Sequence, residues 1–177
     1  MNTNTNLFML IGSPGSGKTP LAKKLKKVLS KNYSMDIVVM DEDVEVLNYI
    51  EEDKNKKFDT ITSVVNEYGK EYVKNIYTEI LLKIKEESKS YPNKIYIYST
   101  GGYNAYLNPK RFKNDFKDNQ LNLFVKTNFE IIRRCILNRI KKRESNAVTM
   151  LDLNENGEIK QKKITSENID EGDFKKH

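Results

Sequence analysis

Eight residues near the N-terminus carry the clearest chemical signal in this sequence. Residues 12–19 read Gly-Ser-Pro-Gly-Ser-Gly-Lys-Thr, a full match to the phosphate-binding pattern G-x-x-x-x-G-K-[ST]. The glycines can take backbone angles closed to other residues, so successive N–H groups can turn toward phosphate oxygens. Lys18 offers a cation to the β- and γ-phosphates, and the Thr19 hydroxyl can ligate Mg²⁺. The motif predicts ATP and Mg²⁺ as cofactors. The residues expected to bind the nucleotide are Gly12, Ser13, Pro14, Gly15, Ser16, Gly17, Lys18 and Thr19.

The sequence on either side of the motif fits this interpretation. Residues 7–11 form a short apolar run that suits a buried parallel strand, and residues 20–29 have helical apolar spacing. Pro20 is tolerated because it falls in the first turn of that helix. The positive end of the helix dipole would then point at the same anion. We therefore expect a strand, the loop and a helix in succession.

A group of acidic residues follows the second β-type run. Residues 36–40 are apolar after Asp36 and lead into Asp41-Glu42-Asp43. Asp41, through water, could hold Mg²⁺ together with Thr19, and Asp43 is the best candidate to orient or deprotonate an acceptor hydroxyl. The alternative is that the two aspartates cap a helix beginning at Val44, since aspartate favours that position. Asp43 could do both.

The rest of the chain alternates between helical and strand patterns. Helical spacing runs from 44 to 50 and again from 61 to 84, the second stretch broken near Gly69, with a polar loop expected at 51–57. The third strand, 94–99, runs into Thr100-Gly101-Gly102. Gly101 and Gly102 would let the backbone approach the acceptor; an ordinary turn is the alternative. A fourth strand at 121–126 precedes a helix from about 129 to 142.

This alternation predicts an α/β fold of the three-layer P-loop NTPase type. We expect a parallel sheet of about four to five strands, helices on both faces and a lid segment. Residues 1–177 would form a single domain, with a lid or hairpin at about 139–163, turning at Asn156-Gly157, and a polar, frayed tail at 165–177. Ligands of such sheets collect at the carboxyl ends of the strands, where the P-loop, Asp41-Glu42-Asp43 and Gly101-Gly102 all begin.

Composition narrows the class of protein. The chain is 32% charged and 37% hydrophobic, which is ordinary for a soluble protein, and no apolar stretch approaches the roughly 20 residues of a membrane span. The N-terminus lacks a signal-peptide pattern and Cys135 is the single cysteine, so we expect a cytoplasmic protein without disulfides. The net charge of +6 is scattered among acids, which argues against a dedicated nucleic-acid surface without excluding one. The oligomeric state is left open.

The order of these motifs resembles shikimate kinase and related small P-loop kinases over about residues 7–143. The resemblance lies in the P-loop, Asp-x-Asp after the second strand, Gly-Gly after the third, and helices echoing that family's substrate-binding region at 61–82. It implies transfer of the γ-phosphoryl group of ATP to a small hydroxylated acceptor. It also implies a catalytic Arg134 and nucleotide contacts from Arg139 or Arg143 near the lid. The acceptor would be bound by Asp43, Lys74, Gly101 and Gly102.

The chain departs from the family at its substrate site and lid. Lys74 stands where the family has an arginine, and a lysine is a point charge without the planar bidentate fork. Tyr103 replaces the third glycine of a three-glycine run, and Glu144 replaces the proline expected after Arg143. A kinase of nucleotides or polynucleotide ends is therefore the alternative to a shikimate kinase-like enzyme. A nucleotide-binding protein without turnover is a second alternative.

Overall fold

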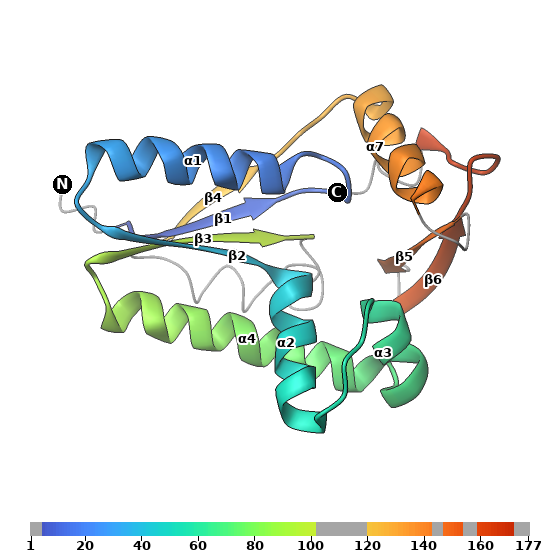
Figure 1. Ribbon diagram of the computed structural model, residues 1–177, viewed down its shortest axis with the longest axis horizontal. Coiled ribbons are helices and arrows are strands. Elements are labelled where there is room, and N and C mark those ends of the chain that lie inside the picture. The colour runs from blue at the N-terminus through green and yellow to red at the C-terminus, as the bar shows by residue number, and fades with distance from the viewer. Residues whose placement is uncertain (1–4, 102–119, 143–146, 154–158, 172–177) are drawn as a thin grey trace.

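The computed structural model describes residues 5–101, 120–142, 147–153 and 159–171. Strands and helices alternate through most of this part of the chain, and an antiparallel hairpin follows the last helix (Figure 1). In chain order the elements are β1 (Leu7–Ile11), α1 (Lys18–Asn32), β2 (Asp36–Asp41), α2 (Glu42–Lys54), α3 (Ile61–Tyr68), α4 (Lys70–Ser90), β3 (Lys94–Thr100), β4 (Gln120–Phe124), α7 (Phe129–Lys141), β5 (Val148–Leu153) and β6 (Ile159–Ile164).

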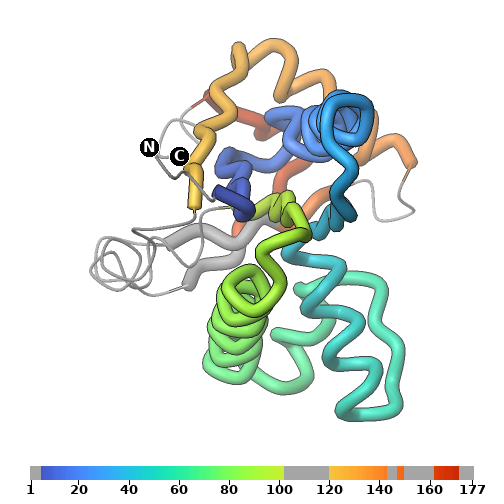
Figure 2. Tube along the Cα trace, turned by 90° about the vertical axis from the view of Figure 1, so that its left-hand side faces the viewer, coloured from blue at the N-terminus to red at the C-terminus, as the bar shows by residue number. Residues whose placement is uncertain are grey.

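Four of the strands form one parallel sheet in the order β2-β3-β1-β4. Helix α1 lies on one face and α4 on the other, so that the molecule has three layers (Figures 1 and 2). The sequence-based prediction of an α/β P-loop fold with a parallel sheet of about four to five strands is confirmed, with four strands in the described part of the chain. The arrangement also brings the carboxyl ends of β1, β2 and β3 level, because Ile11 pairs with Thr100 and Asp41 pairs with Ser99.

Side chains of the central strand β1 alternate between two cores. Leu7 and Met9 join the core under α2, α3 and α4, whereas Leu10 packs on the side of α1. All three are nearly or fully buried, as expected for a parallel strand covered on both faces. The P-loop therefore follows directly from a strand that is paired on both sides and buried on both faces.

The helices of the second layer follow their local signals closely. Thr60 caps α3 by accepting a hydrogen bond from Ser63 N, and Gly69, with φ 85°, separates α3 from α4 as the sequence predicts. Helix α2 is longer than predicted. It begins at Glu42 and continues to Lys54, so the expected loop at 51–57 is wrong over its first four residues. Acidic residues in the first turn complement the helix dipole, and Asn55 ends the helix with φ 49°.

A smaller core joins α7 to the hairpin. Ile132, Ile136 and Ile140 of α7 bury their side chains against Val148 of β5 and Ile164 of β6. The pairing of Val148 with Ile164 and of Leu153 with Ile159 confirms the predicted hairpin, whose turn at Asn156-Gly157 falls outside the described residues. Within the expected lid, residues 139–141 belong to α7.

The start of the predicted tail is ordered as far as residue 171. Asn168 accepts a hydrogen bond from Thr165 N at 2.6 Å and donates one to Lys163 O at 3.0 Å, and Ile169 packs against the core of α7 and the hairpin. The expectation of a frayed segment from residue 165 is therefore wrong over 165–171. An apolar anchor and a local side-chain turn outweigh the polar composition there.

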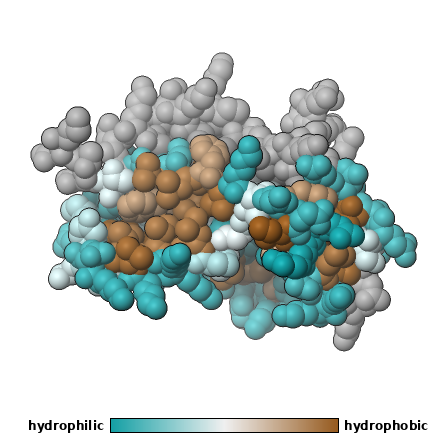
Figure 3. Space-filling view, turned by 90° about the horizontal axis from the view of Figure 1, so that it is seen from above, coloured by the Kyte–Doolittle hydropathy of each residue, from teal (hydrophilic) through white to brown (hydrophobic). Residues whose placement is uncertain are grey.

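The surface on the α1 side is unusually apolar in one place. Seen from that side, brown side chains form a broad patch (Figure 3). Strand β4, which ends the described sheet, contributes exposed large apolar side chains, among them Phe124 at 75% and Leu121 at 44% exposure. Among the described helices, none combines the length and apolar character that a bilayer crossing demands.

Candidate active site

The predicted phosphate-binding loop joins β1 to α1. Gly15 and Gly17 have φ of 81° and 95°, the left-handed region that favours glycine. Gly12 is different, because a Cβ there would lie 2.8 Å from Ser16 Oγ and 2.8 Å from Val125 O. The sequence predicts that unusual backbone angles require a glycine at all three positions, and this explanation holds for Gly15 and Gly17. Gly12 is required by close approach of the loop to the chain after β4.

Lys18 lies folded over this loop. Its Nζ donates hydrogen bonds to Gly12 O at 2.6 Å and to Ser13 O at 3.0 Å. Burial lowers the pKa of Lys18, while the nearby carboxylates of Asp41 and Asp43 act in the opposite direction. The lysine ammonium is thus held at the centre of the loop, where the motif predicts the phosphates.

The loop also has the polar groups that an anion needs. Ser16 is buried, and its Oγ has no hydrogen-bond partner among the described residues. The carbonyl of Ser16 accepts a hydrogen bond from Thr127 Oγ1 at 2.6 Å, and Ser16 N donates to Ser13 O at 3.1 Å around Pro14. The first N–H groups of α1 have no helical acceptor, and its first turn has no acidic residue. An unpartnered hydroxyl beside a helix N-terminus fits a phosphate group.

Thr19 and Asp41 meet at the ends of two different elements. Thr19 Oγ1, in the first turn of α1, donates a hydrogen bond to Asp41 Oδ2 at the end of β2 across 3.3 Å. Asp41 occupies the N-cap position of α2, yet its side chain makes no capping hydrogen bond. A hydroxyl beside a carboxylate is a pair of hard oxygen ligands that suits Mg²⁺. In the described part of the chain no group of three or more His, Cys, Asp or Glu side chains is arranged to hold a metal ion. Mg²⁺ is usually bound by one or two carboxylates together with phosphate and water oxygens.

Asp43, in the first turn of α2, is oriented by a tyrosine of α4, a helix of the same layer. Tyr77 OH of α4 donates to Asp43 Oδ1 at 2.9 Å. Asp43 is an exposed residue. The protein around its carboxylate nevertheless reduces the hydration of the charged form, which raises the pKa of Asp43. The hydrogen bond from Tyr77 acts in the opposite direction. Asp43 also interacts electrostatically with Lys18. A carboxylate held in this way, facing the phosphate loop, can accept a proton from a hydroxyl.

Glu42, between the two aspartates, is the residue that sequence reasoning missed. It is only 3% exposed, and its Oε2 accepts hydrogen bonds from Thr100 Oγ1 at 2.6 Å and Gly101 N at 3.3 Å. Its Oε1 accepts one from Tyr98 OH at 3.2 Å. Burial raises the pKa of Glu42 to about 7, although the Thr100 hydrogen bond opposes the shift. One signal was available, since consecutive side chains point in different directions in both strands and helices, so Asp41, Glu42 and Asp43 cannot all face the same way.

Arg139 is directed toward the phosphate loop. In α7, Ile132 and Cys135 lie against Gly15, and Arg139 is two helical turns after Ile132 on the same face. Its positive charge acts on both Lys18 and Asp43 in the direction that lowers a pKa. Burial has the larger effect on both residues, so the pKa of Asp43 is still raised. The structure therefore brings Arg139 to the predicted site, and Arg143 falls outside the described residues.

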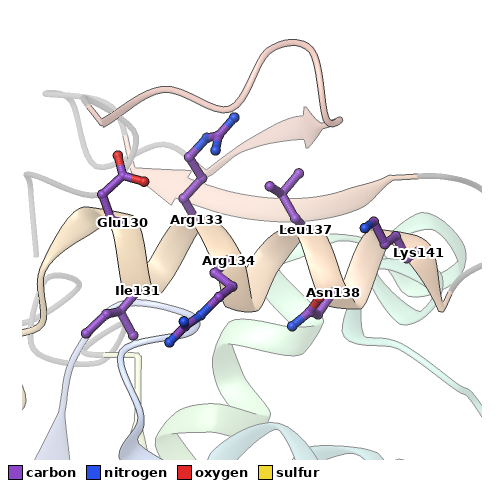
Figure 4. Close-up of a pocket in the computed structure, with 7 residues that line it drawn as sticks. All are labelled: Glu130, Ile131, Arg133, Arg134, Leu137, Asn138 and Lys141. Atoms are coloured by element: carbon purple, nitrogen blue, oxygen red, sulfur yellow. The ribbon is translucent and has the colours of Figure 1, made fainter.

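Arg134 directly precedes Cys135 in α7. Around the helix it lies about 100° from Cys135 and about 160° from Ile132, the two residues that lie against Gly15. Figure 4 shows Arg133 and Arg134 projecting to opposite sides of the helix. Both belong to a depression of about 410 Å³ lined by Glu130, Ile131, Arg133, Arg134, Leu137, Asn138 and Lys141. The catalytic role of Arg134 stays a prediction.

The residues expected to bind the acceptor are only partly brought together. Gly101 N is bound to Glu42, and Gly102 falls outside the described residues. Lys74 lies on α4 one turn before Tyr77, on the side that reaches Asp43, and its Nζ donates to Glu71 Oε2 at 3.3 Å. Lys74 is therefore one turn from the residue that contacts Asp43 and is paired within its own helix.

Comparison with known proteins supports the fold. The sequence matches no family model and no curated protein. The structure is similar to that of a shikimate kinase from Acinetobacter baumannii, solved with shikimate, with a TM-score of 0.54 and 18% identity over 82% of this chain and 69% of that one. The fold is shikimate kinase-like. The structure of APE1195 is also similar, with 21% identity, a TM-score of 0.49 and coverage of 79% of this chain and 74% of that chain. The kinase-like P-loop fold inferred from the sequence is confirmed.

Proposed function

We propose that this chain is an ATP- and Mg²⁺-dependent phosphotransferase that moves the γ-phosphoryl group to a hydroxyl of a small molecule. The supporting observation is the convergence of Lys18, the Thr19–Asp41 pair and Asp43 at one edge of the sheet. The shikimate kinase-like fold supports the same reaction class. A glycine-rich turn without a ligand would not explain why Asp41 and Asp43, at the end of β2, lie beside Thr19 and Lys18.

Each residue has a role that its position supports. Bound Mg²⁺–ATP would supply the phosphoryl group and neutralise its charge. Lys18 and the N–H groups of the loop hold the β- and γ-phosphates, while Thr19 and Asp41 hold the metal. Asp43 orients the acceptor hydroxyl and takes its proton as the new oxygen–phosphorus bond forms and the bond to the leaving ADP breaks. Arg139, on the loop side of α7, stabilises negative charge on the transferring group.

The acceptor is expected to be small and to carry a hydroxyl. Lys74 lies one turn from Tyr77 and offers a single cation that suits an acidic substituent. Shikimate and other hydroxy acids are therefore the first acceptors to test, followed by nucleosides and nucleotides. A polynucleotide end is the alternative that the basic net charge of +6 favours.

One screen tests the proposal. ADP release from Mg²⁺–ATP is followed by a coupled assay with shikimate, other hydroxy acids, nucleosides, nucleotides and a 5′-hydroxyl oligonucleotide. Acceptor-dependent ADP release that is lost in Lys18→Ala, with phosphorylated product detected by mass spectrometry, is expected for a small hydroxylated acceptor. Turnover with the oligonucleotide, and with none of the small molecules, would identify a polynucleotide end as the acceptor. Tight ATP binding without turnover on any acceptor would identify a nucleotide-binding protein instead.

A further inference from the structure

Glu42 occupies a junction that the proposed reaction does not use. The parallel register pairs Asp41 with Ser99, so the next residues along, Glu42 and Thr100, come side by side as the two strands end. The Glu42 side chain turns under β3 and away from the cleft that Asp43 faces. It is buried, and three donors from one neighbouring strand end converge on it.

The contacts of Glu42 connect three strand ends. Thr100 donates its hydroxyl to Glu42 Oε2, and the carbonyl of Thr100 accepts a hydrogen bond from Gly12 N at 3.3 Å. Gly12 is the first residue of the phosphate loop. One short chain of hydrogen bonds therefore runs from the phosphate loop, through Thr100, to the segment that carries Asp41 and Asp43. Gly101 N extends it to the chain that leaves β3.

A stabilising role at the start of α2 explains little of this arrangement. A carboxylate at the protein surface also stabilises a helix N-terminus, and it keeps its contacts with water there. Burying an ionisable group is costly unless its hydrogen bonds are satisfied, and Glu42 accepts hydrogen bonds from two side chains of β3 and from Gly101 N. The side chain is placed to fix one strand end relative to another.

We propose that Glu42 is the positioning residue of the acceptor site, fixing Gly101, the residue that follows β3, at a set distance from Asp43. This inference rests on the proposed phosphotransferase function. Glu42 accepts two hydrogen bonds at Oε2, from Thr100 and Gly101, whereas an amide nitrogen at that place could accept neither. Loss of this link lets the acceptor side of the cleft shift while the phosphate loop keeps its own internal contacts through Lys18.

Three variants test the inference. Glu42→Gln keeps the volume and removes the charge, and Thr100→Val removes one donor to Oε2 with little change of shape. Tyr98→Phe is the matched control, because it removes only the hydrogen bond to Oε1. For Glu42→Gln we expect the KM of the acceptor that is best in the panel above to rise about tenfold, the scale of a lost charge-assisted hydrogen bond. The KM of ATP should stay near the parent value, Thr100→Val should act in the same direction, and Tyr98→Phe should resemble the parent.

The outcomes separate this inference from the proposed function. A parent protein inert toward every acceptor overturns both. An active parent whose acceptor KM is unchanged in Glu42→Gln overturns the positioning role alone. An equal rise in the KM of ATP and of the acceptor also overturns it, since that pattern marks a general loss of structure. If Glu42→Gln does not fold, Thr100→Val decides, and an unchanged acceptor KM in that variant rejects the inference.

Discussion

Thr19 Oγ1 and Asp41 Oδ2 lie 3.3 Å apart across the gap between the first turn of α1 and the last residue of β2. The two residues are 22 positions apart in the sequence, and the register of β2 on β3 and β3 on β1 brings them together. In the ligand-free protein, the hydrogen bond holds both oxygens where a single Mg²⁺ could meet them. The parallel sheet therefore brings the two proposed metal ligands together.

A double-mutant cycle on this pair tests the metal site. Thr19→Val and Asp41→Asn should each weaken Mg²⁺–ATP binding by about tenfold, and the double variant should lose less than the product of the two effects, because both residues serve one ion. Isothermal calorimetry with Mg²⁺ and with EDTA provides the measurement. ATP affinity in EDTA should hardly change in Asp41→Asn. Fully additive losses would mean that the two residues do not share a ligand.

Lys18→Ala tests the phosphate loop. The variant removes the ammonium that bridges Gly12 O and Ser13 O, and loss of its hydrogen bonds to phosphate should weaken ATP binding by roughly 10- to 100-fold. Lys23→Ala is the control, since Lys23 is an exposed lysine of the same helix. Calorimetry should find parent affinity in the control. Equal ATP affinity in Lys18→Ala and the parent would reject the site.

Asp43→Asn separates chemistry from binding. The amide cannot take a proton from the acceptor, so turnover should fall by roughly 100-fold or more while Mg²⁺–ATP affinity is kept. Glu52→Gln, an exposed carboxylate change on the same helix, controls for the loss of charge. Steady-state kinetics with the best acceptor gives the comparison. Turnover at the parent rate in Asp43→Asn would remove Asp43 from the mechanism.

The sequence contained enough to predict the phosphate-binding loop, the parallel sheet and the meeting of the motifs at the carboxyl ends of the strands. The P-loop has fixed spacing and continuous apolar runs beside it, so local information decides it. The direction of side chains after β2 is different, because it depends on how α2 leaves the sheet. Asp41 and Asp43 face the cleft, while Glu42 turns under β3, and only the register with Ser99 and Thr100 reveals which is buried.

The ends of elements were harder to predict for the same reason. Helix α2 extends through polar residues to Lys54 because the acidic first turn and the left-handed Asn55 define its ends, not the apolar pattern. Along α7, apolar spacing gives the buried stripe but not which part of it meets the loop. The contact of Gly15 with Ile132 fixes that rotation.

Glu42 should make the stability of the ligand-free protein depend on pH. Its pKa is raised from 4.5 to about 7 in the folded state, so the folded protein binds this proton more tightly than the unfolded chain. This contribution of Glu42 to the free energy of unfolding is complete below pH 4.5 and is lost as the pH rises through 7. From the size of the shift, the loss is on the order of 3 kcal/mol.

Urea denaturation in EDTA, for the parent and Glu42→Gln at several pH values, measures this effect. Other titrating groups are common to both proteins and largely cancel in the difference. The parent should lose stability relative to Glu42→Gln between pH 4.5 and pH 8. A difference that is flat with pH would show that Glu42 titrates normally.

The two arginines of α7 offer the sharpest test of the catalytic assignment. Arg139 shares the face of Ile132, which packs on Gly15, and its charge acts on both Lys18 and Asp43, whereas Arg134 is not among the charges that act on either residue. Arg139→Ala should therefore lower kcat by about tenfold or more, since it removes a cation beside the transferring group. Arg134→Ala removes the same charge from the same helix and should leave kcat near the parent value. Steady-state kinetics at saturating ATP and acceptor makes the comparison, and a larger loss in Arg134→Ala than in Arg139→Ala would return the catalytic role to Arg134.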